Sequence, residues 1–171
     1  MAGSINRMQF LRGDFHGSED PIRPPWSSAE QLFQEKCTGC GDCVTACPYQ
    51  LISLGRAKYP EMNFTHYGCD FCGECVLVCK PQALQRGGTA SAPPWYLTAE
   101  ILSPCLSLNG VVCRACGEAC EVRAIDFKLE MRGVARPILD KHSCTGCGEC
   151  FAVCPIKAVK ISSTRARDEA A

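Results

Sequence analysis

The sequence has no hydrophobic run long enough to cross a membrane and no excess of charge of either sign. No apolar stretch approaches the roughly 18 residues that a transmembrane helix needs. Lysine and arginine together number 18, and so do aspartate and glutamate, so the basic surface typical of nucleic-acid-binding proteins is lacking. We therefore expect no direct membrane insertion and no nucleic-acid partner.

The first 26 residues also lack the features of a secretory signal. They contain no apolar core of about seven residues, and charged or polar side chains stand where such a core would lie, at Asp14, His16, Glu19 and Asp20. We therefore expect a cytoplasmic protein. Reducing conditions there favour metal binding by cysteines over disulfide formation.

Signatures of an independent catalytic site are missing as well. Gly39 and Gly41 do not form the G-x-G-x-x-G fingerprint of a dinucleotide-binding loop, and no nucleophile and base pair is recognisable. No C-x-x-C is followed by histidine, which excludes covalent haem. We therefore expect a protein that is not an enzyme and that acts through bound metal and through its surfaces.

Cysteine is the residue that the sequence has in abundance. There are 16 cysteines in 171 residues, and all fall into four sets. The first, second and fourth sets along the chain read C-x2-C-x2-C-x3-C. In the third set, seven residues instead of two separate the first cysteine from the second. The sets are Cys37, Cys40, Cys43 and Cys47; Cys69, Cys72, Cys75 and Cys79; Cys105, Cys113, Cys116 and Cys120; and Cys144, Cys147, Cys150 and Cys154.

This spacing resembles that of bacterial [4Fe-4S] ferredoxins. Three cysteines at steps of three can surround one corner of a cluster, and in these ferredoxins the fourth cysteine binds the other cluster of a pair. The resemblance implies four [4Fe-4S] clusters, each with three ligands from one set and one ligand from its partner set. The implied ligand sets are Cys37, Cys40, Cys43 and Cys79; Cys69, Cys72, Cys75 and Cys47; Cys105, Cys113, Cys116 and Cys154; and Cys144, Cys147, Cys150 and Cys120.

Structural zinc is the main alternative for these thiols. Zinc takes four ligands, usually as two separated pairs, so a third cysteine at the next step would be surplus. The sixteen thiols already complete four clusters, so we expect the three histidines, His16, His66 and His142, to be surface or packing residues. We expect the acidic residues beside the cysteines to be solvated, namely Glu74, Glu118 and Glu149.

Short helices and hairpins are predicted between the cysteines, which gives an α+β fold class. The helices are expected at "CVTACP", "CVLVCK" and "CFAVCP", with Pro48 and Pro155 ending the first and the last. One hairpin is predicted from "AIDFKLE" through Gly133 to "PILD", and another from "LISL" through Gly55 to "PEMNF". "AVKIS" places Val159 and Ile161 on one face of a strand.

Two small ferredoxin-like modules joined by a Pro/Gly linker follow from these lengths. We expect a leader at 1–30, modules at 31–85 and 100–163, a linker at 86–99 and a tail at 164–171. Trp95 and Tyr96 are expected to lie against one module, and Trp26 either packs on the first module or serves as a docking anchor. Modules this small usually depend on metal for stability, so loss of the clusters should unfold them.

From about Arg7 to about Ile161 the chain resembles the NapF family, ferredoxin-type accessory proteins of periplasmic nitrate reductase systems. The "IRPPW" stretch at 22–26 and the order of regular and stretched cysteine sets carry this resemblance. It implies a cytoplasmic iron-sulfur protein that contacts the precursor of the reductase's catalytic subunit and assists its maturation, by loading clusters or supplying electrons. The alternative is a general electron-transfer ferredoxin or an iron-sulfur subunit of a redox complex.

Overall fold

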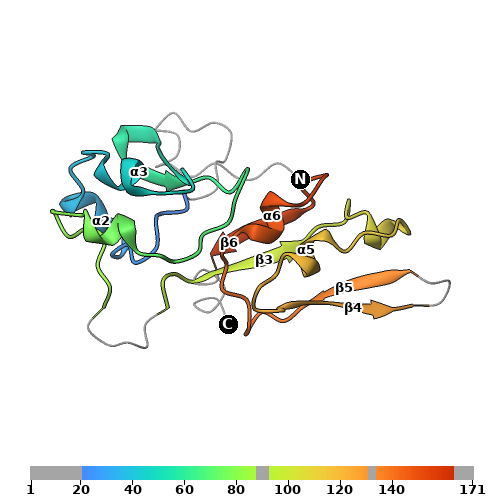
Figure 1. Cartoon of the computed structure of the whole chain (residues 1–171). Helices are drawn as coiled ribbons and strands as arrows, with labels where there is room; N and C mark the ends of the chain where they lie inside the picture. The colour runs from blue at the N-terminus through green and yellow to red at the C-terminus, as the bar shows by residue number, and fades with distance from the viewer. Residues whose placement is uncertain (1–20, 88–92, 131–133, 164–171) are drawn as a thin grey trace, which may run out of the picture.

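The computed structural model describes residues 21–87, 93–130 and 134–163 (Figure 1). The helices are short and the strands form two-stranded antiparallel sheets. The α-helices are α2 (Glu30–Lys36), α3 (Asp42–Ala46), α4 (Glu74–Leu77), α5 (Ala115–Glu118) and α6 (Glu149–Ala152). The strands are β1 (Ile52–Leu54), β2 (Pro60–Met62), β3 (Leu97–Ile101), β4 (Ile125–Leu129), β5 (Ala135–Leu139) and β6 (Val159–Ser163), and two 3-10 turns are η1 (Arg56–Lys58) and η2 (Ser107–Asn109).

Three of the short helices begin directly after a glycine in the left-handed conformation. Gly41, Gly73 and Gly148 have φ angles of 83°, 85° and 87° and precede α3, α4 and α6. A residue with a side chain adopts such an angle at a cost, so glycine suits this sharp entry into the helix. Helices α3, α4 and α6 overlap the predicted segments "CVTACP", "CVLVCK" and "CFAVCP", so these three predictions are confirmed. Helix α5 in the stretched set follows Arg114 instead, with an ordinary negative φ of −132°.

Both predicted hairpins are present. Strand β1 pairs with β2 in a register that places Ile52 opposite Met62, and β4 pairs with β5 so that Phe127 lies opposite Pro137. The turn of the second hairpin, including Gly133, lies outside the described residues. Strand β6 has the predicted face, with Val159 and Ile161 both buried.

A third sheet joins the two ends of the second module. Strand β3 pairs with β6, with Ala99 opposite Ile161, so residues 97–99 of the predicted linker belong to this sheet. The first module is closed in a similar way by an isolated bridge between Ser27 and Leu84. In each module, the chain before the first cysteine thus pairs with the chain after the last one.

The described end of the predicted leader is part of the first module. Pro24 and Pro25 are fully buried, and the backbone N–H of Trp26 donates to the carbonyl of Pro94 at 2.6 Å. The Arg86 guanidinium lies 4.5 Å from the centre of the Trp26 ring, which also meets Phe71 edge-on. Of the two roles considered for Trp26, the structure supports packing on the first module.

Two buried cores hold the chain together, and the second includes residues of both modules. The first consists of Phe33, Ile52, Cys75, Ala83 and Leu84. The second combines Phe64 of the first module with five residues of the second, Ala99, Ile125, Cys150, Val159 and Ile161. The modules therefore share a packed interface as well as the covalent linker. Among the described helices, none has the length and apolar character needed to cross a membrane.

Candidate metal centres

Four cavities in the described part of the chain are each lined by a group of four thiols that combines two cysteine sets, and one of them has a fifth thiol at its edge. The groups are Cys37, Cys40, Cys43 and Cys79; Cys47, Cys69, Cys72 and Cys75; Cys105, Cys113, Cys116 and Cys154; and Cys120, Cys144, Cys147 and Cys150. We call these the first, second, third and fourth sites. Each has the composition that the ferredoxin spacing implies, and the fourth site is also bordered by Cys69.

The short helices divide the thiols between neighbouring sites. Cys43 lies inside α3 and lines the first site, whereas Cys47 follows the end of that helix and lines the second. Cys47 has extended backbone angles, φ −73° and ψ 112°, so its side chain does not continue the helical face of Cys43. Because the helix ends there, one set can serve two sites.

A backbone N–H group donates to the last thiol of every set. The donors and distances are Leu51 to Cys47 at 3.4 Å, Leu84 to Cys79 at 3.4 Å, Ala124 to Cys120 at 3.2 Å and Ala158 to Cys154 at 3.2 Å. Hydrogen bonds of this kind stabilise negative charge on sulfur and tune the potential of a bound cluster. These donors were not singled out in the sequence. Their positions could have been found from the sequence, because each donor residue follows the last cysteine of its set by four or five residues.

The middle thiols of the first, third and fourth sites, Cys43, Cys116 and Cys150, are half-buried or buried and lie near other thiols of their sites. The pKa of Cys43 is raised to about 12, first by burial and then by the negative charge of nearby cysteines such as Cys37. Burial likewise raises the pKa of Cys150 to about 12 and that of Cys116 to about 11, again with neighbouring cysteines adding to the effect. Without metal these thiols are therefore protonated near neutral pH, and metal binding has to displace their protons because the ligand is the deprotonated sulfur.

The thiols of a site line a cavity and do not meet at a single point. Among residues 21–87, 93–130 and 134–163, no three His, Cys, Asp or Glu side chains converge closely enough to hold one metal ion. The chemistry and arrangement of the donors fit a polynuclear cluster, which occupies a volume and takes one thiolate at each corner.

The histidines stand apart from these sites where the structure describes them. His66 and His142 are exposed and line none of the four cavities, and His16 lies outside the described residues. Glu74 and Glu118 are exposed, as expected. Glu149 differs from the expectation, because it is half-buried and its carboxylate accepts a hydrogen bond of 2.6 Å from the backbone N–H of Gly68.

The stretched loop of the third set is held by its own polar side chains. The Asn109 amide donates to the carbonyls of Ser103 and Cys105, both at 2.8 Å. The Ser107 side chain is buried, and its hydroxyl donates to the carbonyl of Ala135 on β5. These bonds fix the longer connection between Cys105 and Cys113.

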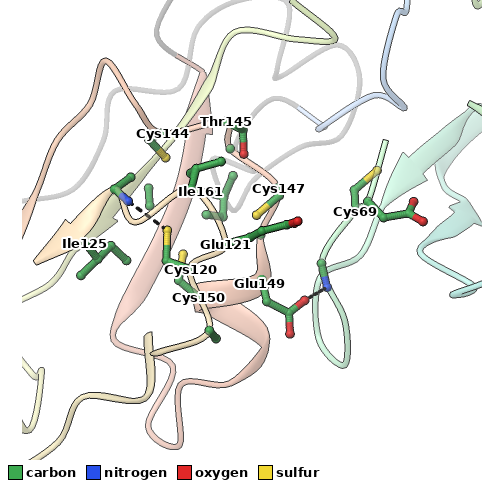
Figure 2. A pocket seen from close by; sticks show the side chains of 18 of the residues that line it. Cys69, Cys120, Glu121, Ile125, Cys144, Thr145, Cys147, Glu149, Cys150 and Ile161 are labelled. Atoms are coloured by element: carbon green, nitrogen blue, oxygen red, sulfur yellow. Dashed lines mark hydrogen bonds between the residues drawn. The ribbon is translucent and has the colours of Figure 1, made fainter. Parts of the chain in front are cut away.

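The fourth site opens into the largest of the four cavities, about 400 Å³ in volume. Figure 2 shows Cys120, Cys144, Cys147 and Cys150 around this cavity, with Cys69 on a separate segment across from Cys147. The cavity wall combines residues of both modules. The interface between the modules therefore lies directly beside two of the cysteine sites.

The family model for the 4Fe-4S dicluster domain matches residues 36–86 and 111–158. The chain is therefore an iron-sulfur protein of the dicluster ferredoxin class, with two such domains. Its sixteen cysteines fit four [4Fe-4S] clusters.

Comparison with known proteins places the chain more narrowly. It is 36% identical over 173 residues to the ferredoxin-type protein NapF of Haemophilus influenzae, covering 95% of this chain and 96% of the relative. It is 36% identical over 154 residues to NapF of Escherichia coli K12, covering 90% and 92%. It is 33% identical over 148 residues to the methylamine utilization ferredoxin-type protein MauM of Paracoccus denitrificans, covering 78% and 66%. The chain belongs to the NapF family of ferredoxin-type proteins.

Gly148→Ala should lower the stability of the cluster-loaded protein more than Gly110→Ala does. Both glycines have left-handed φ angles, 87° and 82°, so both changes cost about 1–2 kcal/mol of conformational energy. A Cβ on Gly148 would also lie 2.3 Å from the Phe64 ring, whereas nothing lies within 4 Å of one on Gly110. This overlap should add about 1–3 kcal/mol. The thermal midpoint, followed by visible absorbance, measures the difference, and equal midpoints would contradict the packing described for Phe64.

Proposed function

We propose that this chain is a cytoplasmic iron-sulfur protein that assists the maturation of the catalytic subunit of periplasmic nitrate reductase before export. The observation that supports the proposal most strongly is the grouping of sixteen thiols into four sites on a chain of the NapF family. Such a chain has the means to store and pass on electrons or iron-sulfur units. The precursor form of the reductase is the partner that this role requires.

The proposed ligands are the four crossed groups that line the cavities. When bound, [4Fe-4S] clusters supply one-electron transfer at potentials set by their surroundings. The chain provides the thiolates, the backbone N–H donors to Cys47, Cys79, Cys120 and Cys154, and the apolar cover from the two cores. Together these groups hold each site in place and limit its contact with water.

Exposure of the thiols favours the first module as the side that meets the partner. Cys40 in the first site and Cys72 in the second are exposed, whereas all eight cysteines of the second module are buried or half-buried. A cluster ligand at the surface lies close to any protein that docks there. Electrons or iron-sulfur units should therefore leave through the first or second site, and the stretched third set has a more protected position.

Deletion of this protein should leave the exported reductase poor in cofactor and lower nitrate reductase activity in the periplasm. A Cys40→Ser variant should reproduce the defect without blocking export, because it removes a proposed ligand at the exposed side. Val112→Ser is the matched control, since Val112 is 87% exposed and lies beside a cysteine without being one. The assays are activity and iron content of the reductase purified from each strain.

A pull-down of the cytoplasmic precursor completes this test. The proposal predicts capture of the precursor by the wild-type chain. Normal activity, normal iron and no capture would contradict maturation and favour the general electron-transfer ferredoxin.

A further inference from the structure

The two modules touch through the backbones of their cysteine loops. The N–H of Cys69 donates to the carbonyl of Cys147 at 2.8 Å. Cys69 lines the second site and Cys147 lines the fourth, so this bond directly joins proposed ligands of two clusters in different modules. Cys69 also borders the cavity of the fourth site.

Glu149 and two glycines bring these loops into contact. The Glu149 carboxylate accepts from the N–H of Gly68 at 2.6 Å, and Figure 2 shows this bond between Glu149, the first residue of α6, and the segment that carries Cys69. A Cβ on Gly68 would lie 2.6 Å from the backbone nitrogen of Glu149, so the close approach requires glycine there. Gly148 has no side chain, which allows the ring of Phe64 from the first module to pack against its backbone.

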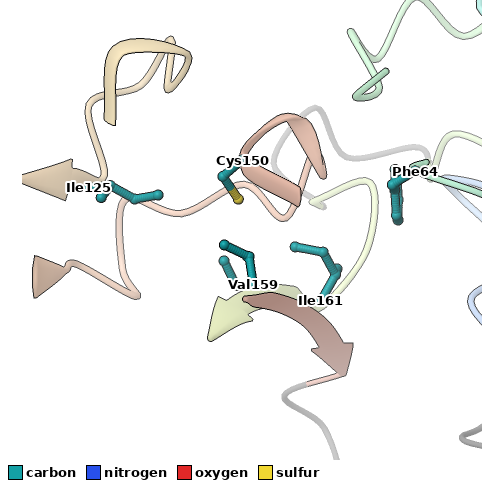
Figure 3. Packing of buried hydrophobic residues seen from close by; sticks show 6 residues of the cluster. Phe64, Ile125, Cys150, Val159 and Ile161 are labelled. Atoms are coloured by element: carbon teal, nitrogen blue, oxygen red, sulfur yellow. The ribbon is translucent and has the colours of Figure 1, made fainter. Parts of the chain in front are cut away.

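Further contacts between the modules surround this point. The indole N–H of Trp95 donates to the carbonyl of Thr145 at 2.8 Å, while the ring packs 5.3 Å from that of Phe71. The Lys157 ammonium donates to the carbonyl of Thr65 at 3.2 Å. Figure 3 shows Phe64 in the same core as Ile161 and Cys150. The loops are thus held together by several independent contacts.

The remaining two sites lie away from the module interface. The cavity of the first site is lined only by residues of the first module, from Phe33 to Leu84, and none of its cysteines lines the cavity of the fourth site as Cys69 of the second site does. The cavity of the third site is lined only by residues of the second, from Ile101 to Val159. The second and fourth sites are therefore the pair that shares a lining residue, Cys69, across the module interface.

We propose that the four sites form one electron-transfer chain in the order first, second, fourth, third, and that Glu149 is the residue that positions the contact between modules. The thiolates of the chain would hold the clusters in this order, and bound clusters would supply one-electron transfer between neighbouring sites. The proposal rests on the crossed ligation proposed above but not on the role in maturation. It extends that role by allowing electrons received at one module to leave at the other.

Glu149→Ala tests the positioning role in the full chain loaded with iron and sulfide. The change removes the acceptor for Gly68 and leaves the other contacts in place, so we expect magnetic coupling between the modules that is weaker than in the wild type in pulsed EPR spectra of the reduced protein. Glu149→Gln keeps an acceptor oxygen and should retain the coupling. Glu74→Ala is the matched control, because Glu74 also stands between a glycine and a cysteine but is exposed. Coupling in Glu149→Ala equal to that of the wild type would overturn the assignment of Glu149.

Hydrogen exchange of the wild-type protein tests the contact without any variant. The amides of Gly68 and Cys69 should exchange slowly, because both donate to groups of the second module. Rapid exchange at these two amides would overturn the proposed contact. A reductase with normal iron in the deletion strain would contradict maturation while leaving both of these results unchanged, so the two proposals fail separately.

Discussion

Cys79→Ser is expected to disturb the cluster at the first site, although Cys79 belongs to the second cysteine set. Its thiol lines the cavity formed by Cys37, Cys40 and Cys43. Serine is a much weaker ligand for iron than a thiolate, so one corner of that cluster should lose its bond or change its potential. EPR spectra of the reduced protein should therefore show the same altered signal in Cys79→Ser as in Cys40→Ser.

Cys72→Ser provides the comparison within the same set. Cys72 lines the second site, so its substitution should alter a different EPR signal. If Cys79→Ser alters the signal that Cys72→Ser alters, each set binds its own cluster and the crossed assignment is wrong. The second module offers an independent pair, because Cys154→Ser should resemble Cys116→Ser and differ from Cys147→Ser.

Removal of iron should unfold both modules. Each buried core contains a proposed ligand, Cys75 in the first and Cys150 in the second, so the clusters are part of the packing. Without metal, the buried thiols of each site would have to remain protonated, and little other apolar surface is available to modules of this size. We expect chelation under reducing conditions to abolish cooperative thermal unfolding.

Far-UV circular dichroism and hydrogen exchange, before and after chelation, measure this effect. Reconstitution with iron and sulfide is the control and should restore both the spectrum and the slow exchange of the core amides. A chelated protein that keeps a cooperative transition and protected amides in β3 and β6 would contradict a structural role for the clusters.

The local features of the chain followed from its sequence because they depend on neighbouring residues. The residues around the cysteines indicated the short helices, alternation of apolar residues indicated the hairpin that begins at Ile125, and Gly55 with Pro60 indicated the one that begins at Ile52. The same spacing implied the crossed groups of thiols that line the four cavities. These features repeat along the chain, so they can be predicted without a structure.

The contact between modules could not be predicted in this way. The bonds from Gly68 to Glu149 and from Cys69 to Cys147 join residues about 80 positions apart, and no local pattern encodes them. The predicted linker, 86–99, includes the first three residues of β3, because a Pro/Gly-rich segment directly precedes them and their partner strand β6 lies far along the chain. Burial of Pro24 and Pro25 likewise depends on the tertiary fold.

Iron and acid-labile sulfide in anaerobically purified protein, measured together with the visible spectrum, test the central claim most directly. Sixteen cysteines in four sites should hold about sixteen iron and about sixteen sulfide per chain, with the broad absorption of [4Fe-4S] clusters. Zinc in place of iron, or a colourless protein without sulfide, would contradict the assignment of the four sites as iron-sulfur centres.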